Sequence, residues 1–149
     1  MARHILVAAL IYSLLCRVES QLDPVSEECL QCICEASTSC DFGVGCGTET
    51  CGPYGITWGY WNDGLRPVLN QDSPEADGAY ARCANDQQCA ARVVQNYMSR
   101  YGHDCNGDAE TTCYDFAAIH RSGSNNCGAQ LDSGYFNRLI NCMALYGMY

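Results

Sequence analysis

The sequence contains no lysine, so its eight basic residues other than histidine are all arginine. They face 17 aspartate and glutamate residues, which gives a formal net charge of −9 at pH 7. Surfaces that bind nucleic acid or anionic membranes need an excess of cationic side chains, and this chain lacks one. We therefore expect no nucleic-acid partner and no membrane partner. The absence of lysine also excludes a lysine general base.

The sequence also lacks an apolar run long enough to span a bilayer. Its longest such stretch, Ile5–Leu15, is shorter than the roughly 20 residues that a transmembrane helix needs. A basic start at Arg3 precedes this stretch and small residues follow it, which is typical of a secretory signal peptide. We expect residues 1–20 to be a signal peptide and residues 21–149 to form one secreted, extracellular domain without linkers or repeats.

Cysteine, in contrast, is abundant, with 13 residues. Cleavage after residue 20 would remove Cys16 and leave twelve, the even number expected of a disulfide framework in an oxidising compartment. An alternative is a zinc site at pairs such as Cys32 and Cys34, but secretion favours disulfides, so we predict six bridges and no metal site. The pairing does not follow from the sequence. The cysteines concerned are Cys29, Cys32, Cys34, Cys40, Cys46, Cys51, Cys83, Cys89, Cys105, Cys113, Cys127 and Cys142.

The first cysteines lie on a predicted helix. Ser26 can cap it, and Glu27 and Glu28 fall in its first turn, where carboxylates are favourable. Glu35 lies off the face that we expect to be buried, because residues follow one another at about 100° round a helix. The positions that form the predicted buried face are Leu30, Ile33, Cys34 and Ser37.

Residues 52–64 contain alternating aromatic residues and end in the turn signal Asn62-Asp63-Gly64, which predicts a small β-hairpin. Residues 65–77 have two prolines and no periodicity, so we expect a loop. The rest of the chain favours helices, and the predicted fold is mainly α with this minor hairpin.

Three further helical segments are predicted after a helical start near Gly78, and the last two should dock on the first, long one. The long helix follows Asn85 and Asp86 and ends at Gly102. The next is capped by Thr112, with Asp115 three residues later, and stops near Gly123; the last begins near Asp132 and Ser133 and carries Phe136, Leu139, Ile140 and Met143.

Several segments resemble the invertebrate-type lysozyme, or destabilase, family. They are CLQCIC at 29–34, CGPYGI at 51–56, CAARVVQNYMSRY at 89–101 and CYDFAAIHRSG at 113–123. The resemblance implies a small lysozyme-like α+β domain with a cleft between its helical and β parts. It also implies peptidoglycan or a related amino-sugar glycan as the partner, no cofactor, and, as in some relatives, isopeptidase activity.

The family's general acid has no counterpart here. In the family, Cys-Ile-Cys is followed by x-x-Glu-Ser-Gly-Cys, and that glutamate is the acid. This chain reads Glu-Ala-Ser-Thr-Ser-Cys, so counting from Cys34 or back from Cys40 places Ser37 at the acid's position. Glu35 cannot replace it, since two residues along a helix lie about 200° apart. Retaining glycoside hydrolysis usually uses two carboxyl groups, so the resemblance implies a divergent relative without an intact catalytic pair.

The family's second carboxylate lies three residues after a Gly-Cys pair, a place that Glu49 can occupy. The segment that follows is shorter than in the family, and Glu49 could instead be a solvated turn residue. The flat faces of Tyr54, Trp58, Tyr60 and Trp61 are typical of a sugar-binding wall, although these residues could also be core. The resemblance supports substrate binding at Tyr60 and Trp61, which match a Tyr-Trp pair of the family, and at His120, which matches its Ile-His position. His120 could instead hold a helix end to a loop.

Three functions remain open. The first is a lysozyme homologue that binds glycan with lost or residual muramidase activity. The second is an active lysozyme that uses Glu49 with an unidentified acid. The third is an isopeptidase that cleaves γ-glutamyl-lysine bonds, for which Ser37 and His120 are one conceivable nucleophile and base.

Overall fold

A computed structural model describes residues 23–148 of the chain. The predicted signal peptide at residues 1–20, its cleavage site and Cys16 lie outside the described residues. Within residues 23–148, no helix has the length and apolar character needed to cross a membrane.

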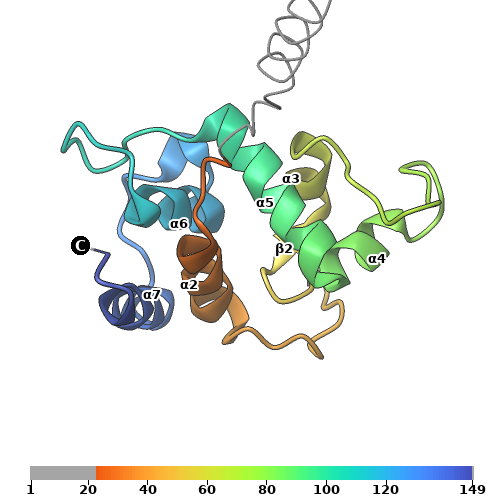
Figure 1. Ribbon diagram of the computed structural model, residues 1–149, viewed down its shortest axis with the longest axis horizontal. Helices are drawn as coiled ribbons and strands as arrows, with labels where there is room; N and C mark the ends of the chain where they lie inside the picture. Colours follow the sequence, from red (N-terminus) through yellow and green to blue (C-terminus); the bar gives the residue numbers. More distant parts are fainter. Residues whose placement is uncertain (1–22, 149) are drawn as a thin grey trace, which may run out of the picture.

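The long helix α5 runs across the molecule, with α2, α6 and α7 on one side and α3 and α4 on the other (Figure 1). The main helix contacts are those of α2 with α7 and α6, and those of α5 with α3, α4 and α6. This arrangement confirms a mainly helical domain with a minor hairpin. The elements are α2 (Glu27–Thr38), β1 (Thr50–Cys51), β2 (Ile56–Thr57), α3 (Trp58–Asp63), α4 (Ala79–Asn85), α5 (Gln87–Tyr101), α6 (Cys113–Ser122), the 3-10 helix η1 (Ser124–Asn126) and α7 (Ser133–Leu145).

Helix α2 begins and ends as its sequence predicts. The Ser26 hydroxyl accepts a hydrogen bond from the Cys29 backbone N–H (3.2 Å), which satisfies one donor of the first turn. Ile33 and Ala36 are fully buried on its inner face. The helix ends where Ser39 takes a left-handed conformation (φ 56°), and the Ser39 N–H bonds the last carbonyls.

Helix α5 is also capped as predicted. The Asp86 carboxylate accepts a hydrogen bond from the Cys89 N–H (2.8 Å), and Val93 and Val94 are fully buried. The helix stops before Gly102, where a β-carbon would lie 2.6 Å from the Met98 carbonyl oxygen. Gly102 is therefore required where the chain turns away from the helix.

The predicted hairpin is only partly correct. Strands β1 and β2 pair antiparallel, with Cys51 opposite Ile56, but the second strand ends at Thr57. The Thr57 hydroxyl accepts a hydrogen bond from the Tyr60 N–H (3.1 Å) and starts helix α3, whose end coincides with the expected turn signal. The actual hairpin turn starts at Gly52 (φ 73°), where a β-carbon would overlap the Ala84 carbonyl oxygen.

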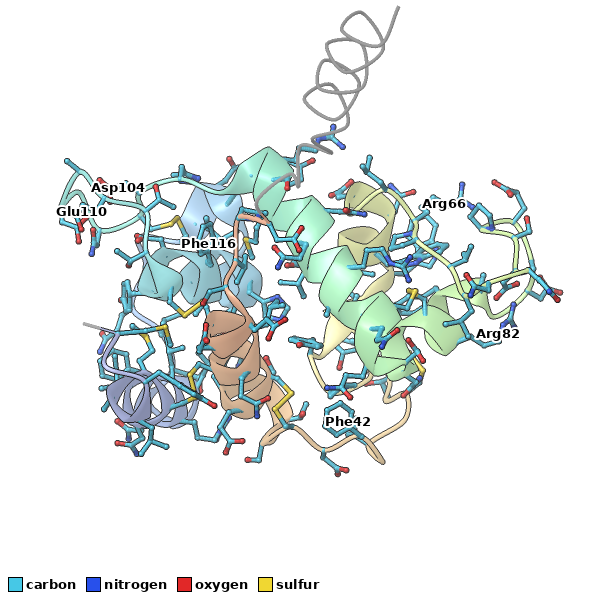
Figure 2. The ribbon with its side chains drawn as sticks, viewed as in Figure 1. Phe42, Arg66, Arg82, Asp104, Glu110 and Phe116 are labelled. Carbon is cyan, nitrogen blue, oxygen red and sulfur yellow. A yellow bond between two sulfur atoms is a disulfide. The ribbon has the colours of Figure 1, made fainter. Side chains whose placement is uncertain are left out.

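The predicted loop at residues 65–77 is confirmed, since it holds no helix or strand. Two arginines fasten it, and both are labelled in Figure 2. Arg82 of α4 binds the Asp72 carboxylate (2.8 Å), and Arg66 reaches Glu75 (3.4 Å) while lying over the Trp61 ring. The loop is thus held against α3 and α4.

Helices α6 and α7 begin as predicted, but α7 docks elsewhere. Asp115 and Thr112 form the expected capping box at the start of α6. Helix α7 packs mainly on α2, not on the long helix. It buries Tyr135, Leu139, Cys142 and Met143, whereas Phe136 and Ile140 of the predicted face are 39% and 37% exposed.

Six disulfides staple the fold, and Figure 2 draws them as yellow bonds. Two of them tie α2 to α6 and to α7. Cys32 and Cys34 belong to different bridges, so neither offers a thiolate to zinc. The pairs are Cys29–Cys113, Cys32–Cys142, Cys34–Cys40, Cys46–Cys51, Cys83–Cys89 and Cys105–Cys127.

Candidate functional site

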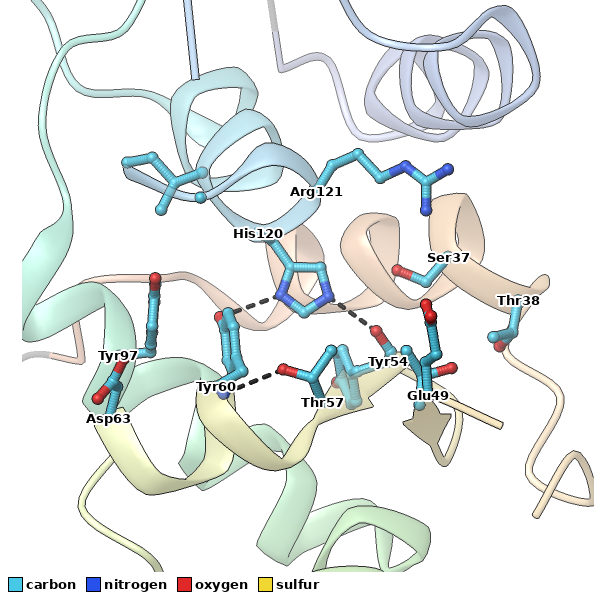
Figure 3. A pocket seen from close by; sticks show the side chains of 14 residues that line it. Ser37, Thr38, Glu49, Tyr54, Thr57, Tyr60, Asp63, Tyr97, His120 and Arg121 are labelled. Carbon is cyan, nitrogen blue, oxygen red and sulfur yellow. Dashed lines mark hydrogen bonds between the residues drawn. The ribbon is translucent and has the colours of Figure 1, made fainter. Parts of the chain in front are cut away.

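A cavity of about 480 Å³ opens between α2 and α6 on one side and the hairpin, α3 and α5 on the other. Most of its polar lining residues carry hydroxyl groups, and Glu49, Asp63 and Arg121 add charged side chains; all three are labelled in Figure 3. Its volume lies in the range of small-molecule sites. The lining residues are Ser37, Thr38, Glu49, Thr50, Tyr54, Gly55, Thr57, Tyr60, Asp63, Tyr97, Ile119, His120, Arg121 and Gly123.

Ser37 lies on the cavity wall at the end of α2, and Glu35 does not line the cavity. The Ser37 hydroxyl donates a hydrogen bond to the Ile33 carbonyl oxygen one turn earlier (2.7 Å). This bond keeps the side chain against its own helix. The wall therefore carries a neutral hydroxyl at position 37, where the resemblance described above places a carboxyl group.

Glu49 lies on the wall from the segment just before β1, at the same end of the cavity as Ser37 and Thr38 (Figure 3). Its side chain is exposed, and it makes no hydrogen bond or ion pair within residues 23–148. The Glu49 carboxylate therefore faces solvent at this end of the cavity.

Asp63 is a wall residue that the sequence prediction missed. It is the last residue of α3 and is half-buried, and it lies beside Tyr97 at the end of the cavity opposite Glu49 (Figure 3). Burial, and then the charge of Asp63, raises the pKa of Tyr97. A helical reading of residues 58–63 would have found it, because Tyr60 and Asp63 are three residues apart and share a helix face.

His120 of α6 is held by two residues of the opposite wall. Its Nε2 lies 2.8 Å from the Tyr54 carbonyl oxygen, and its Nδ1 lies 3.0 Å from the Tyr60 hydroxyl. A carbonyl can only accept, so Nε2 carries the proton and Nδ1 accepts from Tyr60. Burial lowers the pKa of His120 to about 4, which leaves the ring neutral at pH 7. Both nitrogens are thus occupied, and no Ser37–His120 dyad is formed.

The aromatic residues are divided between cavity and core. Tyr60 lines the cavity and stacks on Tyr97, with ring centroids 3.9 Å apart. Tyr54 is only 6% exposed and offers its carbonyl to His120. Trp61, predicted to bind substrate, is 1% exposed, donates its indole N–H to the Pro67 carbonyl (2.8 Å) and does not line the cavity. Trp58 is exposed but lies outside the cavity wall.

Arg121 is the one arginine on the cavity wall. Its guanidinium binds the Asp132 carboxylate through two nitrogens (2.8 and 2.9 Å) and lies over the Tyr135 ring. The Asp132 carboxylate, which does not line the cavity, therefore largely balances the positive charge of Arg121.

A second cluster brings together His103, Cys105 and Cys127. The two sulfurs form a disulfide, so neither can ligate a metal as a thiolate. The His103 Nδ1 donates to the Tyr101 carbonyl (2.9 Å), and its Nε2 lies 3.4 Å from the Cys127 sulfur. This cluster is structural.

The destabilase family model matches residues 26–142. The chain belongs to the destabilase family. It is 34% identical over 121 residues to invertebrate-type lysozyme 3 of Caenorhabditis elegans, covering 78% of this chain and 86% of the relative. It is 34% identical over 128 residues to the lysozyme of Meretrix lusoria, covering 83% and 95%.

The fold of this destabilase-family chain is also that of a known lysozyme structure. The crystal structure of the Meretrix lusoria lysozyme in complex with Aeromonas hydrophila PliI matches with a TM-score of 0.65 at 32% identity. The match covers 84% of this chain and 96% of the other. The predicted family and the lysozyme-like fold are therefore confirmed.

Proposed function

We propose that this protein is a secreted glycan-binding member of its family, whose partner is peptidoglycan or a related amino-sugar polymer and whose muramidase activity is lost or residual. The proposal rests mainly on the serine at position 37. The family resemblance assigns the acid's position to Ser37, and that residue lies on the wall of the cavity together with Glu49. The cleft is kept, and the group that would protonate the leaving oxygen is replaced by a hydroxyl.

The expected chemical loss is large. A serine hydroxyl at its ordinary pKa is a poor proton donor to a glycosidic oxygen, and general-acid assistance contributes on the order of 10²–10⁴ in rate. Glu49 alone supplies one carboxylate, whereas retaining hydrolysis uses two that are about 5 Å apart. The wall still offers Tyr60, Tyr97 and several hydroxyl groups for contacts with a sugar.

The two alternatives have less support from the geometry. An active lysozyme needs an acid besides Glu49, and Asp63 lies at the far end of the cavity. An isopeptidase needs an activated nucleophile, but the Ser37 hydroxyl donates to its own helix and both His120 nitrogens are already bonded.

The test separates binding from hydrolysis. Purified protein is titrated with soluble peptidoglycan fragments, and the same preparation is assayed for lysis of a cell-wall suspension and for cleavage of a γ-glutamyl-lysine substrate. We expect saturable binding with little or no turnover in either assay. Lysis at the rate of an ordinary family member, abolished by Glu49→Gln, would instead establish an active lysozyme. N-terminal sequencing of protein secreted by eukaryotic cells checks the cleavage after residue 20.

A further inference from the structure

Asp63 lies in surroundings that are unfavourable for a carboxylate. It is the last residue of α3, where the partial negative charge of the helix C-terminus opposes another negative charge. It is half-buried, which weakens its hydration, and within residues 23–148 no hydrogen bond or ion pair compensates it. A carboxylate that is unfavourable for its own helix and open to a cavity indicates a ligand rather than a structural partner.

The second carboxylate on the wall is Glu49, at the opposite end (Figure 3). It too is unpaired within the described residues, while the Arg121 charge is taken up by Asp132. Between the two ends stand His120, whose ring is neutral at pH 7, and Tyr60. The cavity thus has two free negative ends separated by an uncharged aromatic and hydroxyl-rich middle.

We propose that this cleft binds oligosaccharides that carry protonated amines, namely glucosamine units, more tightly than their fully N-acetylated counterparts, with Asp63 and Glu49 each receiving an amine. The inference rests on the proposed glycan binding and names its ligand class. The aromatic rings between the two carboxylates contact the sugar planes, while the ends distinguish an ammonium group from an acetamide. The net charge of −9 acts in the same direction at longer range.

The test is a calorimetric titration with a glucosamine tetramer and with its N-acetylated counterpart, at pH 6 and low salt. We expect the wild type to bind the amine form at least about fourfold more tightly, because each of the two carboxylate–ammonium pairs contributes about twofold to fivefold in affinity. The difference should shrink as salt rises, since screening weakens ion pairs between partly exposed groups.

Asp63→Asn isolates the site from the overall charge. We expect it to weaken binding of the glucosamine tetramer about twofold to fivefold and to leave the N-acetylated tetramer unchanged. The matched control is Asp77→Asn, which removes the same charge from an exposed position outside the cavity wall. This control substitution should leave the affinities for both tetramers unchanged.

The outcomes are distinguishable. Binding of both tetramers with equal affinity, unchanged by Asp63→Asn, overturns this inference and leaves the glycan-binding function standing. Binding of neither tetramer also overturns this inference, and the titration with soluble peptidoglycan fragments then decides the glycan-binding function separately. Equal weakening by Asp63→Asn and Asp77→Asn, together with tight binding of a lysine tetrapeptide, reduces the selectivity to bulk attraction and overturns the assigned site.

Discussion

Two features of the cavity wall near Ser37 would shift the pKa of a carboxyl group at this position in opposite directions. The buried wall around Ile119 would raise the pKa of a glutamate at position 37 by desolvation, whereas Arg121 on the same wall would lower it. We expect Ser37→Glu to raise wall lysis above that of the wild type, but only partly, with an optimum on the acidic side of neutral pH. The measurement is the initial lysis rate against pH.

The control for this substitution is Ser99→Glu, which makes the same change on the exposed end of α5, away from the cavity. It should leave the rate unchanged, and both variants must show the same unfolding midpoint as the wild type. An unchanged rate for a well-folded Ser37→Glu would mean that the missing acid is not the main defect of this cleft.

His120 predicts a dependence of stability on pH. Its pKa falls from the usual 6.5 to about 4 on folding, mainly by burial, so between these values the unfolded chain binds the additional proton. The stabilising contribution of the neutral ring is therefore complete above pH 6.5 and is lost as the pH falls toward 4. We expect the stability advantage of the wild type over His120→Gln to shrink across this window in urea unfolding at pH 7, 5.5 and 4.5. A constant advantage would show that burial does not control this ring.

Tyr60, Trp61 and Asp63 show why the site was only partly predictable. Treated as an extended segment, residues 58–63 give no reason to place Asp63 beside Tyr60. In a helix, Tyr60 and Asp63 share one face and reach the cavity, while Trp61 is turned by about 100° into the core. The assignment of Ser37, in contrast, needed only a count between cysteines, which does not depend on the local conformation.

At the scale of elements, neighbouring residues predicted where helices begin, but the sequence did not predict which helices pack together. Ser26, Asp86, Thr112 and Asp132 each begin a helix as their side chains predict, because a cap acts within three residues. The docking of α7 on α2 depends on contacts about 100 residues apart in sequence. One example is Arg138, whose guanidinium donates to the Ala36 carbonyl (2.6 and 3.0 Å). No periodicity within α7 reveals that partner.

Gln95 of α5 makes a long-range contact that can be tested at this scale. Its buried amide accepts from the Val25 N–H (3.0 Å) and donates to the Val25 carbonyl (2.6 Å), which fastens the segment before α2 to the long helix. We expect Gln95→Ala to lower the free energy of unfolding by about 1–3 kcal/mol, because it leaves both backbone groups buried without partners. Chemical denaturation measures it. Gln88→Ala, an exposed site on the same helix, should cost less than about 0.5 kcal/mol, and equal losses would contradict the role of Gln95.

At the scale of the whole molecule, the six disulfides differ greatly in the length of chain that they close. The Cys32–Cys142 bridge spans 110 residues and joins α2 to α7, whereas Cys46–Cys51 spans five within the hairpin region. A cross-link stabilises mainly by restricting the unfolded chain, and its effect grows with the logarithm of the loop length. The long bridge should therefore dominate the stability of the packed α2–α7 unit.

The matched test replaces each bridge by two alanines. We expect Cys32→Ala/Cys142→Ala to lower the free energy of unfolding by about 5 kcal/mol and Cys46→Ala/Cys51→Ala by about 2 kcal/mol, measured by guanidinium unfolding without reductant. Removing the long bridge should lower the free energy of unfolding by more than this loop-closure figure, because Cys32 is fully buried and its sulfur also packs in the core. Equal losses from the two pairs would mean that the α2–α7 contact persists in the denatured chain, so that closing the long loop restricts it little.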